Sequence, residues 1–107
     1  SGSLVDIVLS KKKAAYADID AALKNKTIQK PDAVRLKQVA NGTMSKAEYE
    51  LSSTSNPAEV VEIFGNAMNS ASEDEKKRLR RALSGKKNRA KNEYNKDLYQ
   101  KALVLYK

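Results

Sequence analysis

Residues 56–68 read NPAEVVEIFGNAM, and this stretch predicts a helix that is buried on most of its surface. Asn56 can cap the first turn, and Pro57 suits a position where no amide hydrogen bond is needed. Gly65 costs a helix interior about 1 kcal/mol relative to alanine, so we expect a neighbouring helix to approach closely there. The apolar side chains that surround this helix are Val60, Val61, Ile63, Phe64, Ala67 and Met68. We therefore expect it to be the most buried element of the chain.

Similar start and stop signals recur along the rest of the sequence, whereas sustained alternation of apolar and polar residues does not occur. Caps, first-turn prolines and glycine stops predict further helices over residues 3–24, 31–40, 45–51 and 72–85, with a last helix starting at Ser84 or Asn88. In the helix over residues 31–40, Val34, Leu36 and Val39 are expected to form the apolar side. The predicted fold class is all-α, a small bundle of about five helices with a basic C-terminal helical hairpin over residues 76–96.

The chain has 107 residues, the size of one compact domain, so we expect a single helical domain over residues 1–107. Polar residues at 52–55 mark the expected flexible point within it. Residues 1–3, Ser-Gly-Ser, are expected to be left over from cloning rather than part of a signal peptide. We accordingly expect an intracellular, cytoplasmic protein, and no membrane span because no apolar run approaches about 18 residues.

The composition excludes most familiar kinds of active site. The chain has no Cys and no His, which removes disulfides, thiolate nucleophiles, zinc-finger ligands and imidazole bases. Acidic pairs such as Asp18 with Asp20 are two residues apart, so on a helix they point in different directions. We therefore predict that the protein is not an enzyme and that it uses no cofactor and no metal ion.

Positive charge is concentrated at the C-terminal end of the chain. The net charge is +8, from 21 Lys and Arg against 13 Asp and Glu. Residues 76–107 hold 12 Lys and Arg against 2 Asp and Glu, a net charge of +10, whereas residues 1–75 hold 9 against 11. Such a segment suggests a polyanionic partner, with nucleic acid first, an anionic membrane surface second and an acidic protein third. The lysine run at residues 11–13 is more typical of a solvated helix face.

The region around Gly85 predicts where phosphate would bind. If Gly85 ends one helix, then Lys86, Lys87, Arg89 and Lys91 gather around the N-terminus of the next, where the helix dipole is already positive. Free amide groups together with Lys and Arg are the ingredients of a phosphate site. If residues 73–106 instead form one long helix, this argument fails and only an exposed charged face remains. The side chains expected on that face are Lys77, Arg78, Arg80 and Arg81.

We predict non-catalytic binding of nucleic acid, DNA or RNA, through its phosphates, with low sequence specificity because few base-reading side chains can be identified. Tyr94 is the candidate for base stacking, although tyrosines at helical spacing are more often core or rim residues. The predicted phosphate contacts are Lys76, Lys77, Arg78, Arg80, Arg81, Lys86, Lys87, Arg89 and Lys91.

The alternative function is a protein–protein interaction or structural module, such as an excised domain of a larger assembly. Its last helix, rich in Ala, Leu and Tyr, would dock a protein partner or a second copy of the chain. A DNA-reading helix-turn-helix over residues 31–51 is disfavoured, because Glu48 and Glu50 would repel phosphate in the helix that reads the groove.

Overall fold

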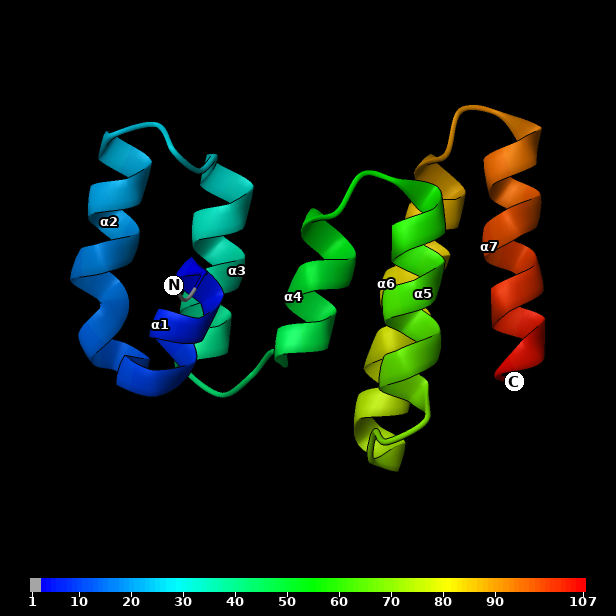
Figure 1. Ribbon diagram of the computed structural model, residues 1–107, viewed down its shortest axis with the longest axis horizontal. Helices are drawn as coiled ribbons and strands as arrows, with labels where there is room; N and C mark the ends of the chain where they lie inside the picture. The colour runs from blue at the N-terminus through cyan, green and yellow to red at the C-terminus, as the bar shows by residue number, and fades with distance from the viewer. Residues whose placement is uncertain (1–2) are drawn as a thin grey trace. The chain divides into compact units, whose positions relative to one another are not determined.

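The computed structural model describes residues 3–107, and every regular element in this range is a helix, which confirms the predicted all-α class for the described residues. The expectation that residues 1–3 are left over from cloning falls on Ser1 and Gly2, which lie outside the described residues, and on Ser3, the N-cap of the first helix. In chain order the elements are α1 (Leu4–Lys11), the 3-10 helix η1 (Lys12–Ala15), α2 (Tyr16–Lys24), α3 (Lys30–Ala40), α4 (Lys46–Ser53), α5 (Pro57–Met68), α6 (Glu73–Arg89) and α7 (Glu93–Leu105) (Figure 1).

The chain divides into two compact units, Ser1–Tyr49 and Glu50–Lys107, and the boundary falls inside α4. The linker expected at residues 52–55 is shorter than predicted. Ser52 and Ser53 belong to α4, and the Thr54 amide donates to the Glu50 carbonyl oxygen at 3.0 Å. Folding of residues 1–107 as one domain stays a prediction, and each unit is described by itself.

The N-terminal unit is organised around α3, which contacts α1, η1 and α2. Burial of aliphatic side chains from all of these elements stabilises the unit, because apolar surface is removed from water. The buried residues of this core are Val5, Val8, Ala15, Ile19, Ala33, Leu36, Val39 and Ala40.

The predicted helix over residues 3–24 is wrong, because the chain bends at Lys12. This residue has φ 55° and ψ −130°, a conformation that residues other than glycine rarely adopt. A straight helix of that length would extend about 30 Å and carry its two ends away from each other. The bend instead lets α1 and α2 both pack against α3. Lys11 crosses the bend and pairs with Asp18 at 2.8 Å, while Lys12 and Lys13 are exposed, as expected of a solvated face.

The apolar side of α3 also differs from the prediction. Val34 is 58% exposed, although it was expected to face the core. Ala33 takes the buried position instead, because it shares a helix face with Leu36 and Ala40.

Helix α4 is joined to α1 within the N-terminal unit. The Lys46 ammonium lies 2.9 Å from the Asp6 carboxylate, and this hydrogen bond holds the pKa of Asp6 below its usual value of 3.8. The stabilising effect of the pair is therefore present above pH 3.8 and is lost as the pH falls through the lower pKa of the folded state. Ser45 and Glu48 form the predicted capping box, with the Ser45 amide donating to Glu48 at 3.1 Å and the Glu48 amide to Ser45 at 3.2 Å.

Helices α2 and α3 end in the same way. After α3, the Gly42 amide donates to the Val39 carbonyl oxygen at 3.1 Å, with Gly42 at φ 80°, which confirms the predicted left-handed end. After α2, the Lys26 amide donates to the Leu23 carbonyl oxygen at 3.1 Å, with Lys26 at φ 62°. A threonine follows each time and its hydroxyl bonds a carbonyl oxygen five residues back, at 3.0 Å and 3.1 Å. The same motif thus uses glycine at one helix end and lysine at the other.

The C-terminal unit contains α5, α6 and α7, which pack against one another pairwise (Figure 1). Phe64 lies fully buried on α5 and meets the Tyr106 ring edge to face, with centroids 5.7 Å apart at 87°. A Cβ at Gly65 would lie 3.2 Å from the Tyr106 hydroxyl, so the close approach expected at this glycine is confirmed. The buried residues of this unit are Leu51, Val60, Phe64, Met68, Leu79, Leu83, Tyr99 and Ala102.

The predicted end of a helix at Gly85 is wrong, because α6 continues to Arg89. The chain then leaves the helical conformation at Ala90, and Asn92 caps α7 by accepting from the Asn95 amide at 2.8 Å, so one long helix over residues 73–106 is also excluded. The start of the last helix predicted at Ser84 or Asn88 is wrong too, because both residues lie inside α6. An interior glycine costs a helix only about 1 kcal/mol, which burial of side chains such as Leu79 and Leu83 offsets.

The two helix ends of the N-terminal unit allow a matched test of backbone strain. We expect Lys26→Gly to stabilise the protein by about 0.5–1 kcal/mol, because glycine adopts a positive φ without the penalty that a β-carbon brings. Gly42→Ala is expected to destabilise it by about 1 kcal/mol for the same reason, since open space surrounds this position and only backbone strain acts. Urea denaturation measures the free energy of unfolding of both variants. Changes of the same sign in the two variants would contradict the interpretation that the two helix ends share one motif.

The two interior glycines of the C-terminal unit allow a second matched test. We expect Gly85→Ala to stabilise α6 by up to about 1 kcal/mol, because the new methyl group meets only the far end of the flexible Arg89 side chain. Gly65→Ala raises the helix propensity by the same amount, but its methyl group meets the Tyr106 hydroxyl. We therefore expect a smaller stabilisation than for Gly85→Ala, or a destabilisation. Adding Tyr106→Phe should restore the gain at Gly65. Equal stabilisation by both alanines in urea denaturation, unaffected by Tyr106→Phe, would contradict the close contact.

Candidate nucleic-acid interface

The predicted phosphate contacts lie on α6 and on the connection that follows it. Ser72 caps α6 by accepting from the Glu75 amide at 3.2 Å, and the first turn carries only acidic charge, from Glu73, Asp74 and Glu75. The cations begin with Lys76, whose ammonium lies 3.8 Å from Glu73. Charge along α6 therefore changes from negative to positive, which complements the helix dipole.

The expectation that cations surround a helix N-terminus is wrong for most of them. Lys86, Lys87 and Arg89 lie in the last turn of α6, where the helix dipole is negative and attracts cations. Lys91 alone of the predicted contacts lies in the connection, just before the Asn92 cap of α7. The helix dipole therefore already favours Lys86, Lys87 and Arg89, and the predicted argument from a helix N-terminus does not apply to these three cations.

The cations of α6 also do not share a single exposed face. Successive residues turn about 100° around a helix, so Arg78 and Arg80 point in nearly opposite directions. Lys77 and Arg81 are exposed and lie one turn apart, whereas Arg78 and Arg80 are half-buried. Arg78 is engaged with other groups, and Arg80 lines a groove against α7.

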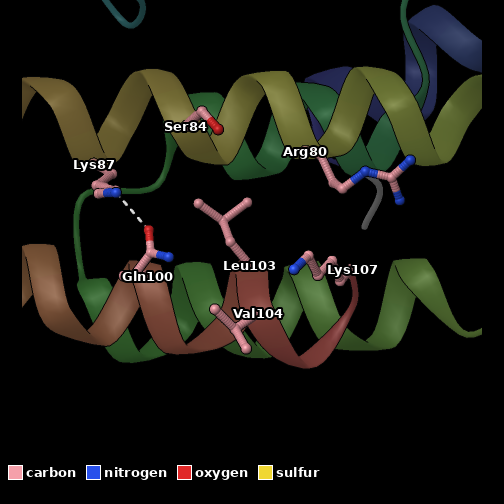
Figure 2. A pocket seen from close by; sticks show the side chains of 7 residues that line it. All are labelled: Arg80, Ser84, Lys87, Gln100, Leu103, Val104 and Lys107. Carbon is pink, nitrogen blue, oxygen red and sulfur yellow. Dashed lines mark hydrogen bonds between the residues drawn. The ribbon is translucent and has the colours of Figure 1, made fainter.

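This groove lies between α6 and α7 and has a volume of about 400 Å³. The helices are antiparallel, because a residue of the first half of α6 and the residue that ends the chain line the same groove. The Lys87 ammonium donates to the Gln100 side-chain oxygen across it (Figure 2). None of the lining residues, all within the described range, is acidic. They are Arg80, Ser84 and Lys87 from α6 and Gln100, Leu103, Val104 and Lys107 from α7 and the residues after it.

Sequence reasoning missed the part of this groove that α7 supplies. Lys107, Gln100 and the α6 residue Ser84 were not among the predicted contacts. Spacings of three, four or seven residues connect the lining residues of each helix, which is the signature of one helix face. That signal becomes useful only when the two faces are known to oppose each other.

A second hollow, of about 300 Å³, gives Lys86 a structural role. The Lys86 ammonium donates to the Thr54 carbonyl oxygen at 2.7 Å, so its charge is used inside the C-terminal unit. Tyr99 lines the same hollow, and burial raises the pKa of its hydroxyl above the usual 10.0. The remaining lining residues are Ser55, Pro57, Arg89, Ala90 and Asn95.

The three C-terminal tyrosines have different environments. Tyr99 is buried, and Tyr106 packs against Phe64. Tyr94 is 77% exposed near the start of α7, so it is the tyrosine of the three that a base can reach. Base stacking on Tyr94 stays a prediction.

Within residues 3–107, no cluster of acidic side chains could hold a metal ion. In the same range no helix has the length and apolar character needed to cross a bilayer. Comparisons with protein-family models, curated proteins and solved structures give no match. The function must therefore be argued from the chemistry of these surfaces.

Two Lys→Met variants separate the effect of losing the Lys86 hydrogen bond from the effect of losing a positive charge. We expect Lys86→Met to destabilise the protein by about 1–3 kcal/mol, because a charge-assisted bond to a carbonyl oxygen is lost. The matched change Lys77→Met, at an exposed position on the same helix, should alter stability by no more than about 0.5 kcal/mol. Chemical denaturation compares the two, and equal effects would show that the Thr54 contact contributes nothing.

Proposed function

We propose that the C-terminal unit binds nucleic acid without catalysis, through its phosphates and with low sequence specificity. The observation that carries this proposal is the number of cations left without acidic partners. Within residues 3–107, six of the predicted contacts have no ion-pair partner: Lys77, Arg80, Arg81, Lys87, Arg89 and Lys91. Cations that are not neutralised within the protein are free to replace the counterions of a polyphosphate backbone.

The proposed binding surface is the basic hairpin formed by α6, the connection over residues 90–92 and the start of α7. Three of the cations without acidic partners, Arg80, Arg81 and Arg89, are arginines, whose planar guanidinium groups bind phosphate oxygens through paired hydrogen bonds. Long basic side chains on a helix contact phosphates but read no base edges, which is the reason for expecting low specificity.

A second candidate function is docking of a protein or a second copy through the end of α7. Val104 is 57% exposed and Leu105 is 75% exposed, so two neighbouring aliphatic side chains at the end of α7 are available to a partner. This function predicts association that depends on protein concentration rather than on salt.

Salt dependence distinguishes these functions. If about six cations replace counterions on a duplex, the slope of log affinity against log salt is expected to be near −5. The exposed triple variant Lys77→Gln, Arg81→Gln and Lys91→Gln should make this slope shallower by about 2.7, at about 0.9 per lost contact. Fluorescence anisotropy with a labelled duplex across a salt series measures both slopes.

The matched control removes the same charge from the N-terminal unit. Lys13, Lys24 and Lys30 are exposed, so their triple change to Gln should leave the slope unchanged. A flat salt response of the unmodified protein, or equal loss in both triple variants, would overturn the proposed surface. A sedimentation coefficient that rises with concentration in the absence of nucleic acid would support the docking function in its place.

A further inference from the structure

We propose that the groove between α6 and α7 holds an unpaired nucleic-acid strand, with its phosphates on Arg80, Lys87 and Lys107 and its bases and sugars on Leu103 and Val104. This inference rests on the proposed function and assigns it a ligand class, single strand rather than duplex. It also places the single strand in the groove, whereas a duplex would contact the exposed cations of the hairpin.

The size of the groove supports a ligand thinner than a duplex. Its volume of about 400 Å³ falls in the range of sites that enclose small molecules or single chemical groups. Arg80 and Lys87 are seven residues apart, about 10.5 Å along the helix axis, which corresponds to about three stacked nucleotides at 3.4 Å each. A short stretch of one strand therefore matches the separation of the cations at the two ends.

Two of the three cations in the groove are better prepared for phosphate than those on the outside. Arg80 and Lys87 are half-buried, and salt screens a partly buried charge less than an exposed one. The bond to Gln100 holds the Lys87 ammonium at the groove and uses only one of its three donors (Figure 2). Fewer side-chain rotamers are lost on binding when a cation is already held in place.

The apolar residues of the groove explain why the strand should be unpaired. Leu103 lies between the two helices in Figure 2, whereas Val104 lies over α7, and both line the groove together with the cations. A duplex presents its sugar–phosphate backbone outward and keeps its bases paired inside, so this surface would stay uncovered. An unpaired strand can place base or sugar faces against it while its phosphates reach the cations.

An acidic residue limits the proposed site at one end of the groove. A separate hollow of about 350 Å³ shares Arg80 and Lys107 with the groove and is also lined by Glu73 and Lys76. Lys76 already faces the Glu73 carboxylate at 3.8 Å, and this acid at the start of α6 repels phosphate. We therefore place the strand between Lys87 and Arg80 rather than along the whole hairpin.

The test compares two triple variants that remove equal charge from the same helical unit. The groove variant carries Arg80→Gln, Lys87→Gln and Lys107→Gln. The outer variant carries Lys77→Gln, Arg81→Gln and Lys91→Gln. Affinity for labelled oligothymidine of about 16 nucleotides and for a duplex of the same length is measured at one salt concentration. We expect the unmodified protein to prefer the single strand. The groove variant should lose at least about tenfold in single-strand affinity, and more than it loses for duplex.

A further variant keeps the charge unchanged. Val104→Asn replaces an exposed apolar side chain of the groove by a polar one of similar size, so the fold should be retained, and chemical denaturation checks this. We expect a loss of about threefold to tenfold for the single strand and none for the duplex. This variant keeps the inference testable if the groove triple variant fails to fold.

The outcomes separate the inference from the function on which it rests. Binding that depends on salt, with a preference for duplex or with equal losses in the groove and outer variants, would overturn the groove site and leave nucleic-acid binding intact. Absence of any binding by the unmodified protein would overturn both. Selective loss of single-strand binding in the groove variant and in Val104→Asn would support the site.

Discussion

The packing of α6 against α7 is the interaction on which the candidate site depends. Leu79 and Leu83 are completely buried on α6, and Tyr99 and Ala102 are buried on α7. Burying these side chains fixes the rotation of each helix about its axis, because apolar faces at helical spacing must meet. That rotation directs Arg80 and Lys87 toward α7 and leaves Lys77 and Arg81 in water. Loss of this packing would scatter the cations without changing the net charge at all.

The C-terminal cations consequently differ in what they do. Lys86 on α6 donates a hydrogen bond to the Thr54 carbonyl oxygen, and Lys76 lies near the Glu73 carboxylate in the first turn of α6. Lys87 is held at the groove by a neutral partner, Gln100, and keeps its charge available. A count of basic residues treats these side chains alike, whereas their contacts separate structural cations from those that remain available to a phosphate. Lys77, Arg81 and Lys91 are exposed and are the simplest probes of electrostatics, because Arg89, which is also exposed, lines the second hollow.

The sequence predicts helix starts better than helix ends or helix rotation. The caps at Ser45, Asn56 and Ser72 were all predictable, because a cap is a hydrogen bond between residues two or three apart. The prediction failed at Gly85 and at Lys12, where a local preference for one conformation competes with packing against residues far along the chain. Glycine favours a helix end, yet α6 continues through Gly85. Lysine disfavours a positive φ, yet the bend at Lys12 brings α1 onto α3.

By itself the sequence determined the all-α class, most helix starts and the concentration of positive charge after residue 75. These properties follow from composition and from bonds between near neighbours, so no knowledge of distant contacts is needed. Tertiary structure decided which cations line a groove, that Lys107 and Gln100 join them, and that Lys86 is a structural residue. The physical reason is that a side chain on a helix gains its partners from whichever neighbour the buried face selects, and that choice is made by residues far apart in the chain.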